Sequence, residues 1–262
     1  MRATRRLAAC LAGLCLLSLQ GHAGMERLDV AVSTPVYALP ATLTHPEGRF
    51  DYRLSWMGIP VGHARIEARA AGPGWLDVAV RGGTASAIDL LWRYRVEGHG
   101  TVRTDPLAPV RFATLEREND RVREVEVRID RRTGAARSER RAGGVVDRYE
   151  FESTNSFDIP SSVLLVLGLD YEPGDRFRID TFTGTRRYLV EAVVRGLESI
   201  RAGGERRDAW KLRLSTDDLT DRDPDGLHHA TELWVSRERP RVLLRARSWT
   251  FVGPVSLELA EP

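Results

Sequence analysis

The stretch Phe50-Asp51-Tyr52-Arg53-Leu54-Ser55-Trp56 alternates large apolar side chains with polar ones. Successive side chains of a β-strand point to opposite faces, so this alternation predicts a strand with one buried face and one solvated face. Gly58 and Pro60 interrupt the pattern, and it resumes at Val61. We therefore expect a strand, a tight turn and a second strand over residues 50–70.

Alternating stretches of the same kind recur along the rest of the chain. They lie near residues 75–80, 92–97, 124–129, 149–151, 177–179, 210–214, 242–246 and 255–259. Turns containing Gly or Pro separate many of them, and short connections favour antiparallel neighbours. We therefore expect a mainly β fold, either a curled antiparallel sheet or an open β-barrel, of about ten to twelve strands with one or two short helices.

Two segments depart from the strand pattern. Residues 84–91 begin with a plausible cap and predict two helical turns. Residues 158–169 begin with Asp158 and have a proline early and a glycine near the end, which is typical of a helix. Residues 163–167 are apolar all round, so we expect this helix to lie against the concave side of the sheet or in its mouth. A fully buried strand is the alternative.

The N-terminus predicts export. Three arginines precede an apolar run over residues 7–19, and small residues end at Ala23, as in a secretory signal peptide. We expect residues 1–23 to be a signal peptide, 24–47 an irregular leader with three prolines, and 48–262 a single β-rich domain. The two cysteines, Cys10 and Cys15, leave with the signal, which excludes disulfides and thiolate chemistry from a mature periplasmic protein.

Composition narrows the class of protein further. The 262 residues include 39 basic and 37 acidic side chains and are 42% hydrophobic. That hydrophobic content allows a sizeable core and excludes the regime of disorder. The near balance of charge argues against a nucleic-acid partner, because binding phosphates requires a basic excess on one surface. We also expect no transmembrane segment in the mature chain.

The segment from Tyr52 to Ala64 resembles the entry motif of a bacterial exported family named domain of unknown function 3108. The helix candidate at 158–169, Pro173-Gly174, the Leu233-Trp234-Val235-Ser236 strand and Pro240 follow in the order typical of that family. The resemblance covers roughly residues 48–260 and implies an exported, curved antiparallel sheet with no activity to transfer. Its outline is also similar to that of the periplasmic lipoprotein carriers. One departure is Arg237-Glu238, where the family more often has Asp.

A calcium-loop pattern occupies residues 221–232. Carboxylates at the first, third and fifth positions, glycine at the sixth and glutamate at the twelfth are the hard oxygen ligands that calcium prefers. The candidate ligands are Asp221, Asp223, Asp225, the Leu227 carbonyl and Glu232. A plain connection between two strands is the alternative, because Asp-Pro-Asp-Gly is an excellent turn sequence. A zinc site at His228-His229 is less favoured, since adjacent strand residues point to opposite faces.

The chain has no Gly-x-Ser-x-Gly, Ser-x-x-Lys or H-E-x-x-H motif, which leaves no nucleophile or zinc-protease signature. Inward aromatic side chains are abundant instead. The candidate ligand-binding residues are Tyr52, Trp56, Trp92, Tyr94 and Trp210. We expect an exported, non-enzymatic protein whose concave face binds a hydrophobic ligand, lipid-like or peptide, or an envelope partner, with no cofactor other than calcium. The alternatives are a carboxylate-dependent hydrolase of envelope glycans and a structural or adaptor protein.

Overall fold

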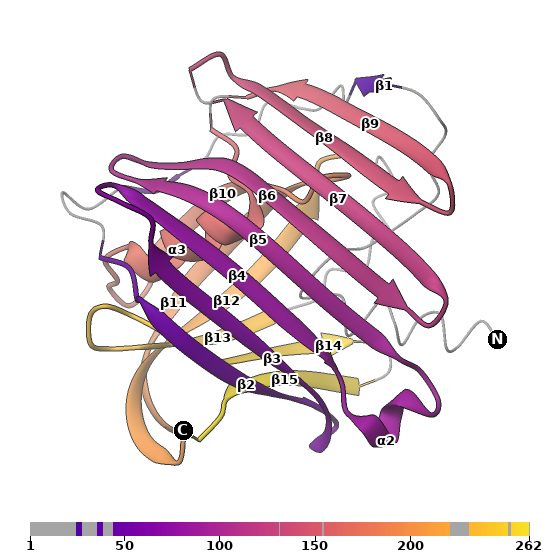
Figure 1. Cartoon of the computed structure of the whole chain (residues 1–262). Coiled ribbons are helices and arrows are strands. Elements are labelled where there is room, and N and C mark those ends of the chain that lie inside the picture. Colours follow the sequence, from indigo (N-terminus) through magenta and orange to yellow (C-terminus); the bar gives the residue numbers. More distant parts are fainter. Residues whose placement is uncertain are drawn as a thin grey trace.

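A long sheet curls around one buried helix in the computed structural model of this chain (Figure 1). The structure describes residues 25–27, 36–38, 44–130, 132–153, 155–220, 231–250 and 253–261. Within these residues the sheet has fifteen strands in the order β1-β9-β8-β7-β6-β5-β4-β3-β2-β15-β14-β13-β12-β11-β10. The prediction of a mainly β fold built on one curled antiparallel sheet is confirmed.

Two meanders build the sheet. The N-terminal meander contains β2 (Gly48–Trp56), β3 (Ile59–Ala70), β4 (Trp75–Thr84), β5 (Tyr94–Thr104), β6 (Leu107–Glu118), β7 (Arg121–Asp130), β8 (Ala135–Ala142) and β9 (Val145–Glu152). The C-terminal meander contains β10 (Arg176–Phe182), β11 (Arg187–Ala202), β12 (Glu205–Asp218), β13 (Thr231–Ser236), β14 (Leu243–Thr250) and β15 (Gly253–Leu259). The last strand pairs with the first, with Leu257 opposite Leu54 and Val255 opposite Trp56.

The sheet is not closed into a barrel, because the edges at β9 and β10 do not pair with each other. Described pieces of the segment before β2 contact both edges. The short β1 (Met25–Arg27) pairs in parallel with β9, and the backbone of Val36 exchanges hydrogen bonds of 3.0 and 2.8 Å with Arg178 of β10. The one leader segment therefore satisfies backbone groups on two edges that would otherwise be unpaired.

The number of strands was predicted too low. The structure has fourteen antiparallel strands, β2 to β15, besides the short parallel β1. The predicted stretches leave out β6, β8 and β11. In β8 the inward positions hold Ala136, Ser138 and Arg140 instead of large apolar side chains. The hairpin tip between β10 and β11 lies over this part of β8, and Ser138 Oγ donates a hydrogen bond to the carbonyl of Gly184. Small and polar residues suit a strand that is covered so closely.

Both predicted helices are present. The first is a single turn, α2 (Ser86–Asp89), and the second is α3 (Ile159–Gly168), so the buried-strand alternative for the apolar run was wrong. Asp158 caps α3, with its Oδ1 accepting a hydrogen bond of 2.9 Å from the backbone N–H of Ser161. Pro160 in the first turn supports the helical backbone without losing a helical hydrogen bond.

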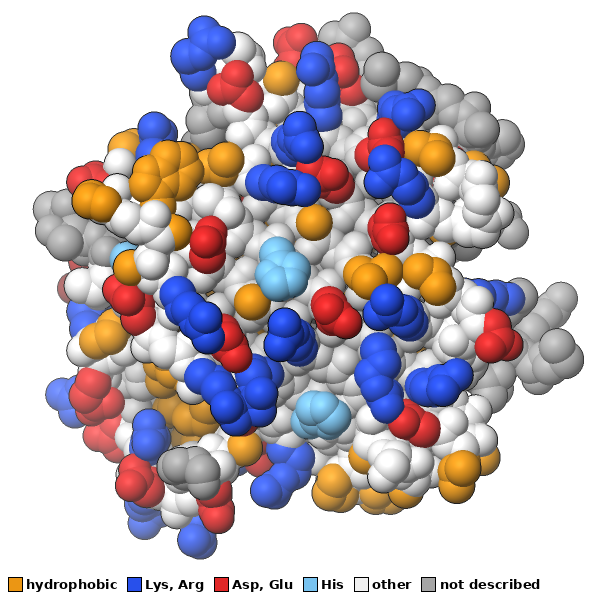
Figure 2. Space-filling model, in the orientation of Figure 1, with side chains coloured by type: hydrophobic (Ala, Val, Ile, Leu, Met, Phe, Trp, Pro, Cys, Tyr) orange, Lys and Arg blue, Asp and Glu red, His pale blue; other side chains and the backbone are white. Residues whose placement is uncertain are grey.

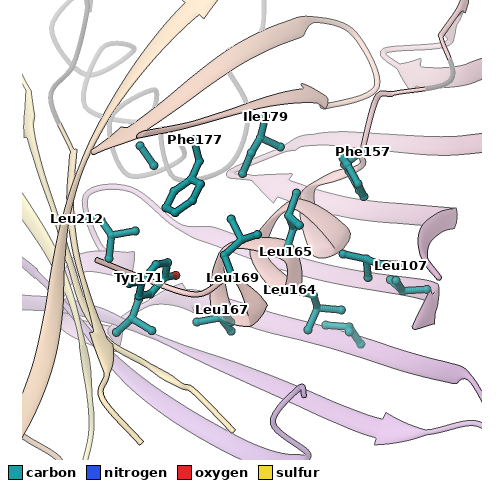
Figure 3. Packing of buried hydrophobic residues seen from close by; sticks show 14 of the residues in the cluster. Leu107, Phe157, Leu164, Leu165, Leu167, Leu169, Tyr171, Phe177, Ile179 and Leu212 are labelled. Atoms are coloured by element: carbon teal, nitrogen blue, oxygen red, sulfur yellow. The ribbon is translucent and has the colours of Figure 1, made fainter. Parts of the chain in front are cut away.

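Helix α3 lies on the concave side of the sheet and supplies the centre of the main core, as Figure 3 shows. Leu164, Leu165 and Leu167 of α3 are buried together with inward residues from both meanders. Those partners include Leu76, Val102, Leu107, Phe177, Ile179, Val194 and Leu212. The helix thus joins the two meanders where the sheet itself has no ladder.

The outer face of the sheet is charged. Arginine side chains alternate with carboxylates over the face shown in Figure 2. Cross-strand pairs such as Arg137 with Glu150 and Arg148 with Glu139, each 3.0 Å between the charged atoms, account for this pattern. Such exposed pairs contribute little stability, about 0–1 kcal/mol each. They make the convex face a solvated surface.

Candidate functional site on the concave face

The concave face of β2, β3 and β13 to β15 carries a band of apolar side chains that is only partly covered. Tyr52, Ala246 and Leu257 are buried at its base. Seven half-buried apolar side chains pack around them: Phe50, Leu54, Ala64, Ile66, Leu233, Leu243 and Leu259. We call these ten residues the apolar strip. Inward apolar side chains that remain partly accessible are the ordinary lining of a small-molecule site.

The strip exists because α3 covers only part of the concave side. The first turn of α3 lies directly on β5, where a Cβ atom at Gly100 would be 2.9 Å from Cγ of Pro160. Helix α3 contacts β5, β6 and β10. In the strand order the apolar strip lies between these contacts, with β5 and β6 beyond β3 on one side and β10 beyond β13 on the other. Ile66 and Leu233 at its margins also pack against the core around α3.

Four of the five aromatic residues predicted to bind a ligand lie in strands, and Trp92 lies just before β5; the five belong to different clusters. Tyr52 lies in the apolar strip and donates a hydrogen bond of 3.0 Å to the carbonyl of Leu243. Burial raises the pKa of Tyr52. Trp92 and Tyr94 stack on each other, with ring centroids 5.5 Å apart. Trp210 packs against the main core and meets Tyr171 edge-on at 5.9 Å.

Trp56 is half-buried at the end of β2, where it pairs with Val255 and Ile59. The structure therefore brings Trp92 and Tyr94 together and places Tyr52 in the strip, while Trp210 lies against α3's core. The five residues are not one constellation. Tyr52 is the member that the apolar strip contains.

Sequence reasoning missed two ion pairs on the inner side of β6 to β9. Glu116 of β6 is 2% exposed and bonds to Arg123 of β7. Asp147 of β9 is 4% exposed and lies 3.2 Å from Arg140 of β8. Burial raises the pKa of Glu116, and the guanidinium of Arg123 opposes that rise.

These four charges could have been found from the sequence, because odd and even positions of a strand face opposite sides of the sheet. Arg123 has the same parity as the inward Val125 and Val127, and Glu116 the same parity as Phe112. A charged residue at an otherwise apolar parity indicates a buried pair. Because each acid has an arginine partner, the pairs do not form the two opposed free carboxyl groups that glycan hydrolysis requires.

A hollow of about 340 Å³ lies on the outer face of β12 to β15. Lys211 on its floor lies 3.3 Å from Glu198 and 3.2 Å from Glu232. The indole of Trp234 lies beneath the Lys211 amine at 5.0 Å and donates a hydrogen bond of 2.8 Å to Glu198. Lys211 is thus paired with two carboxylates, and Arg245 in the lining pairs with Glu258 at 2.9 Å.

Glu232, the predicted twelfth position of the calcium loop, therefore pairs with Lys211. The other predicted ligands, Asp221, Asp223, Asp225 and Leu227, lie outside the described residues, as do His228 and His229. Their segment connects β12 to its antiparallel neighbour β13. No group of three metal-binding side chains gathers within the described part of the chain.

None of the described helices is both long and apolar enough to cross a bilayer. The arrangement of an open, curled antiparallel sheet around a helix defines the class of protein as β-barrel-like. Residues 51–260 match the family described as protein of unknown function (DUF3108), and the chain belongs to that family. The predicted resemblance over residues 48–260 is thereby confirmed.

One solved structure shows the same fold. A crystal structure of a β-barrel-like protein of the DUF1849 family from Brucella abortus is similar, with a TM-score of 0.60 and 10% identity over 84% of this chain and 96% of that chain. A protein with a YmcC-like fold from Bacteroides fragilis covers the same share of this chain and 99% of its own, with a TM-score of 0.35 and 7% identity. No curated protein matches the sequence.

Proposed function

We propose that this chain is an exported, non-enzymatic protein that binds a hydrophobic ligand, lipid-like or peptide, against the apolar strip. The observation that carries the proposal is the partial exposure of seven apolar side chains on the concave face, around buried Tyr52, Ala246 and Leu257. At the centre of the core around α3, by contrast, Leu165, Leu212 and Val235 are fully buried.

A ligand that covered these side chains would gain about 25 cal/mol for each Å² of apolar surface removed from water. The strip has few polar groups to fix a ligand's orientation, since the hydroxyl of Tyr52 already donates to Leu243. This favours a ligand recognised by its apolar length, such as an acyl chain, over a compact polar molecule.

Export is part of the proposal. It is supported by three signal-peptide features: arginines before residue 7, the apolar run over residues 7–19 and the small residues ending at Ala23. The chain after Ala23 also has no cysteine.

The test is binding of a dansyl-labelled fatty acid to the purified protein, followed by fluorescence. We expect saturable binding that Ala64→Phe weakens about tenfold or more, because the added ring lies beside Tyr52 and Ile66 and fills the strip. His63→Phe is the matched control, since His63 is its exposed neighbour in β3 and faces away from the strip. Equal affinities of the two variants, or no saturable binding by the wild-type protein, would refute the proposal.

A further inference from the structure

Seven of the eleven exposed large apolar side chains in the described residues gather at one end of the sheet. They belong to the turns β2–β3, β6–β7 and β8–β9, to the chain after α2, and to the end of β14. We call them the apolar rim: Met57, Ile59, Leu90, Leu91, Val122, Val145 and Trp249. Figure 2 shows apolar side chains along the right and lower-right edge, where Figure 1 places α2 and the β6–β7 and β8–β9 turns.

Backbone contacts place these turns next to one another. The N–H of Met57 donates to the carbonyl of Pro254 at 2.8 Å, which joins the β2–β3 turn to the β14–β15 end. The N–H of Ala85, just before α2, donates to Val61 at 2.8 Å. Asn119 in the β6–β7 turn donates to Arg93, also at 2.8 Å, and the ladder then leads on to the β8–β9 turn. The rim therefore follows one end of the sheet as a series of neighbouring but separate turns.

The most exposed members sit on a firmly held turn. Leu90 is 87% exposed and Leu91 is 85% exposed, whereas Trp92 next to them is buried against Tyr94. Asp89 fixes the turn by accepting a hydrogen bond of 2.5 Å from Thr84 and pairing with Arg95 at 2.5 Å. The two leucines thus point into solvent from a turn whose backbone is already ordered, so little conformational entropy of the turn is lost on binding.

Cationic side chains accompany the apolar ones. Arg93, Arg121 and Arg247 are exposed and have no carboxylate within ion-pair distance in the part of the chain that the structure describes. The guanidinium of Arg247 stacks on the ring of Trp249 at 4.7 Å. Asp120 is an exposed acid beside Arg121. Arginines next to protruding Leu and Trp side chains complement a surface with anionic headgroups above an apolar layer.

We propose that the apolar rim docks this protein onto an anionic phospholipid membrane, with the leucine, methionine and tryptophan tips entering the boundary between headgroups and acyl chains. The tips come from separate turns at the same end of a curled sheet, so they can meet one plane together. A protein partner would instead cover a contiguous apolar patch or groove. The inference stands apart from the ligand of the apolar strip, which could bind without docking.

Flotation with vesicles tests the proposal. We expect the purified protein to float with vesicles of 70% phosphatidylcholine and 30% phosphatidylglycerol, and less with pure phosphatidylcholine or at high salt. The double variant Leu90→Gln/Leu91→Gln should lose about tenfold or more of the partition coefficient, because each leucine no longer enters the apolar layer. Both side chains are exposed, so the melting temperature should not change.

The matched control is Val163→Gln/Leu197→Gln, which alters two exposed apolar side chains outside the rim. Any contribution of the apolar residues 7–19 is common to all variants. Equal flotation of the two double variants, or no flotation of the wild-type protein, would overturn the proposal. Binding of the dansyl-labelled fatty acid should be the same in Leu90→Gln/Leu91→Gln and wild type, which separates this inference from the proposed ligand.

Discussion

Replacing Gly100 by alanine tests whether α3 is as tightly seated on the concave face as the structure indicates. The new Cβ would lie 2.9 Å from Cγ and 3.3 Å from Cβ of Pro160, a rigid ring in the first turn of α3. The helix or the strand must then move by several tenths of an ångström. Overpacking of this kind costs about 1–3 kcal/mol, which for a domain of this size lowers Tm by about 2–12 °C.

Gly98 supplies the matched control two residues earlier on the same inward face of β5. A Cβ there meets its nearest neighbour, Cε2 of Phe112, at 3.5 Å, which is ordinary contact. Gly98→Ala should therefore be neutral or stabilise the protein by about 0.5 kcal/mol, since glycine weakens a strand interior. The assay is thermal and urea unfolding followed by circular dichroism. Equal stability of Gly100→Ala and Gly98→Ala would refute the packing of α3 on β5.

Three further predictions concern buried charge and calcium. Burial raises the pKa of Asp158 to about 6 from 3.8, so the free energy of unfolding of the wild-type protein should fall by up to about 3 kcal/mol as pH rises from about 4 to 6. Asp158→Asn keeps the capping oxygen, and its unfolding free energy in urea should not fall over this pH range. The same fall in both proteins would contradict the prediction. Arg123→Met leaves Glu116 buried without its countercharge and should lower the free energy of unfolding in denaturant by about 3 kcal/mol. Adding Glu116→Leu to this variant should restore at least half of the lost stability, and no recovery would contradict an electrostatic cause. If residues 221–232 bind calcium, calorimetric titration of the protein with calcium should give heat that Asp223→Asn/Asp225→Asn abolishes. No heat with the wild-type protein would show that these residues do not bind calcium.

Most of the fold followed from alternation alone. The stretch at 50–56 predicted β2, and the apolar run at 163–167 predicted a helix on the concave side, which α3 is. In β8 alternation failed because the inward positions do not hold large apolar side chains. β8 was missed because Ala136 and Ser138 are small beneath the β10–β11 tip, and tertiary packing, not local preference, determines such a strand.

The candidate site was less predictable. Inward aromatics could be recognised by parity, but which cluster each would join depends on how strongly the sheet curls. Trp210 therefore lies against Tyr171 beside α3, while Tyr52 lies in the apolar strip. The buried pair of Glu116 and Arg123 was missed for another reason. Charged residues are typical of an exposed face, but the positions of these two in β6 and β7 face inward.

The most direct test of the central claim is the mass of the protein purified from cells and measured by native mass spectrometry, followed by organic extraction. The account predicts a bound hydrophobic molecule in one-to-one ratio that is released on denaturation, and lower occupancy in Ala64→Phe than in His63→Phe. A wild-type mass equal to that of the polypeptide alone, with no lipid or peptide in the extract and no uptake of added fatty acid, would contradict it.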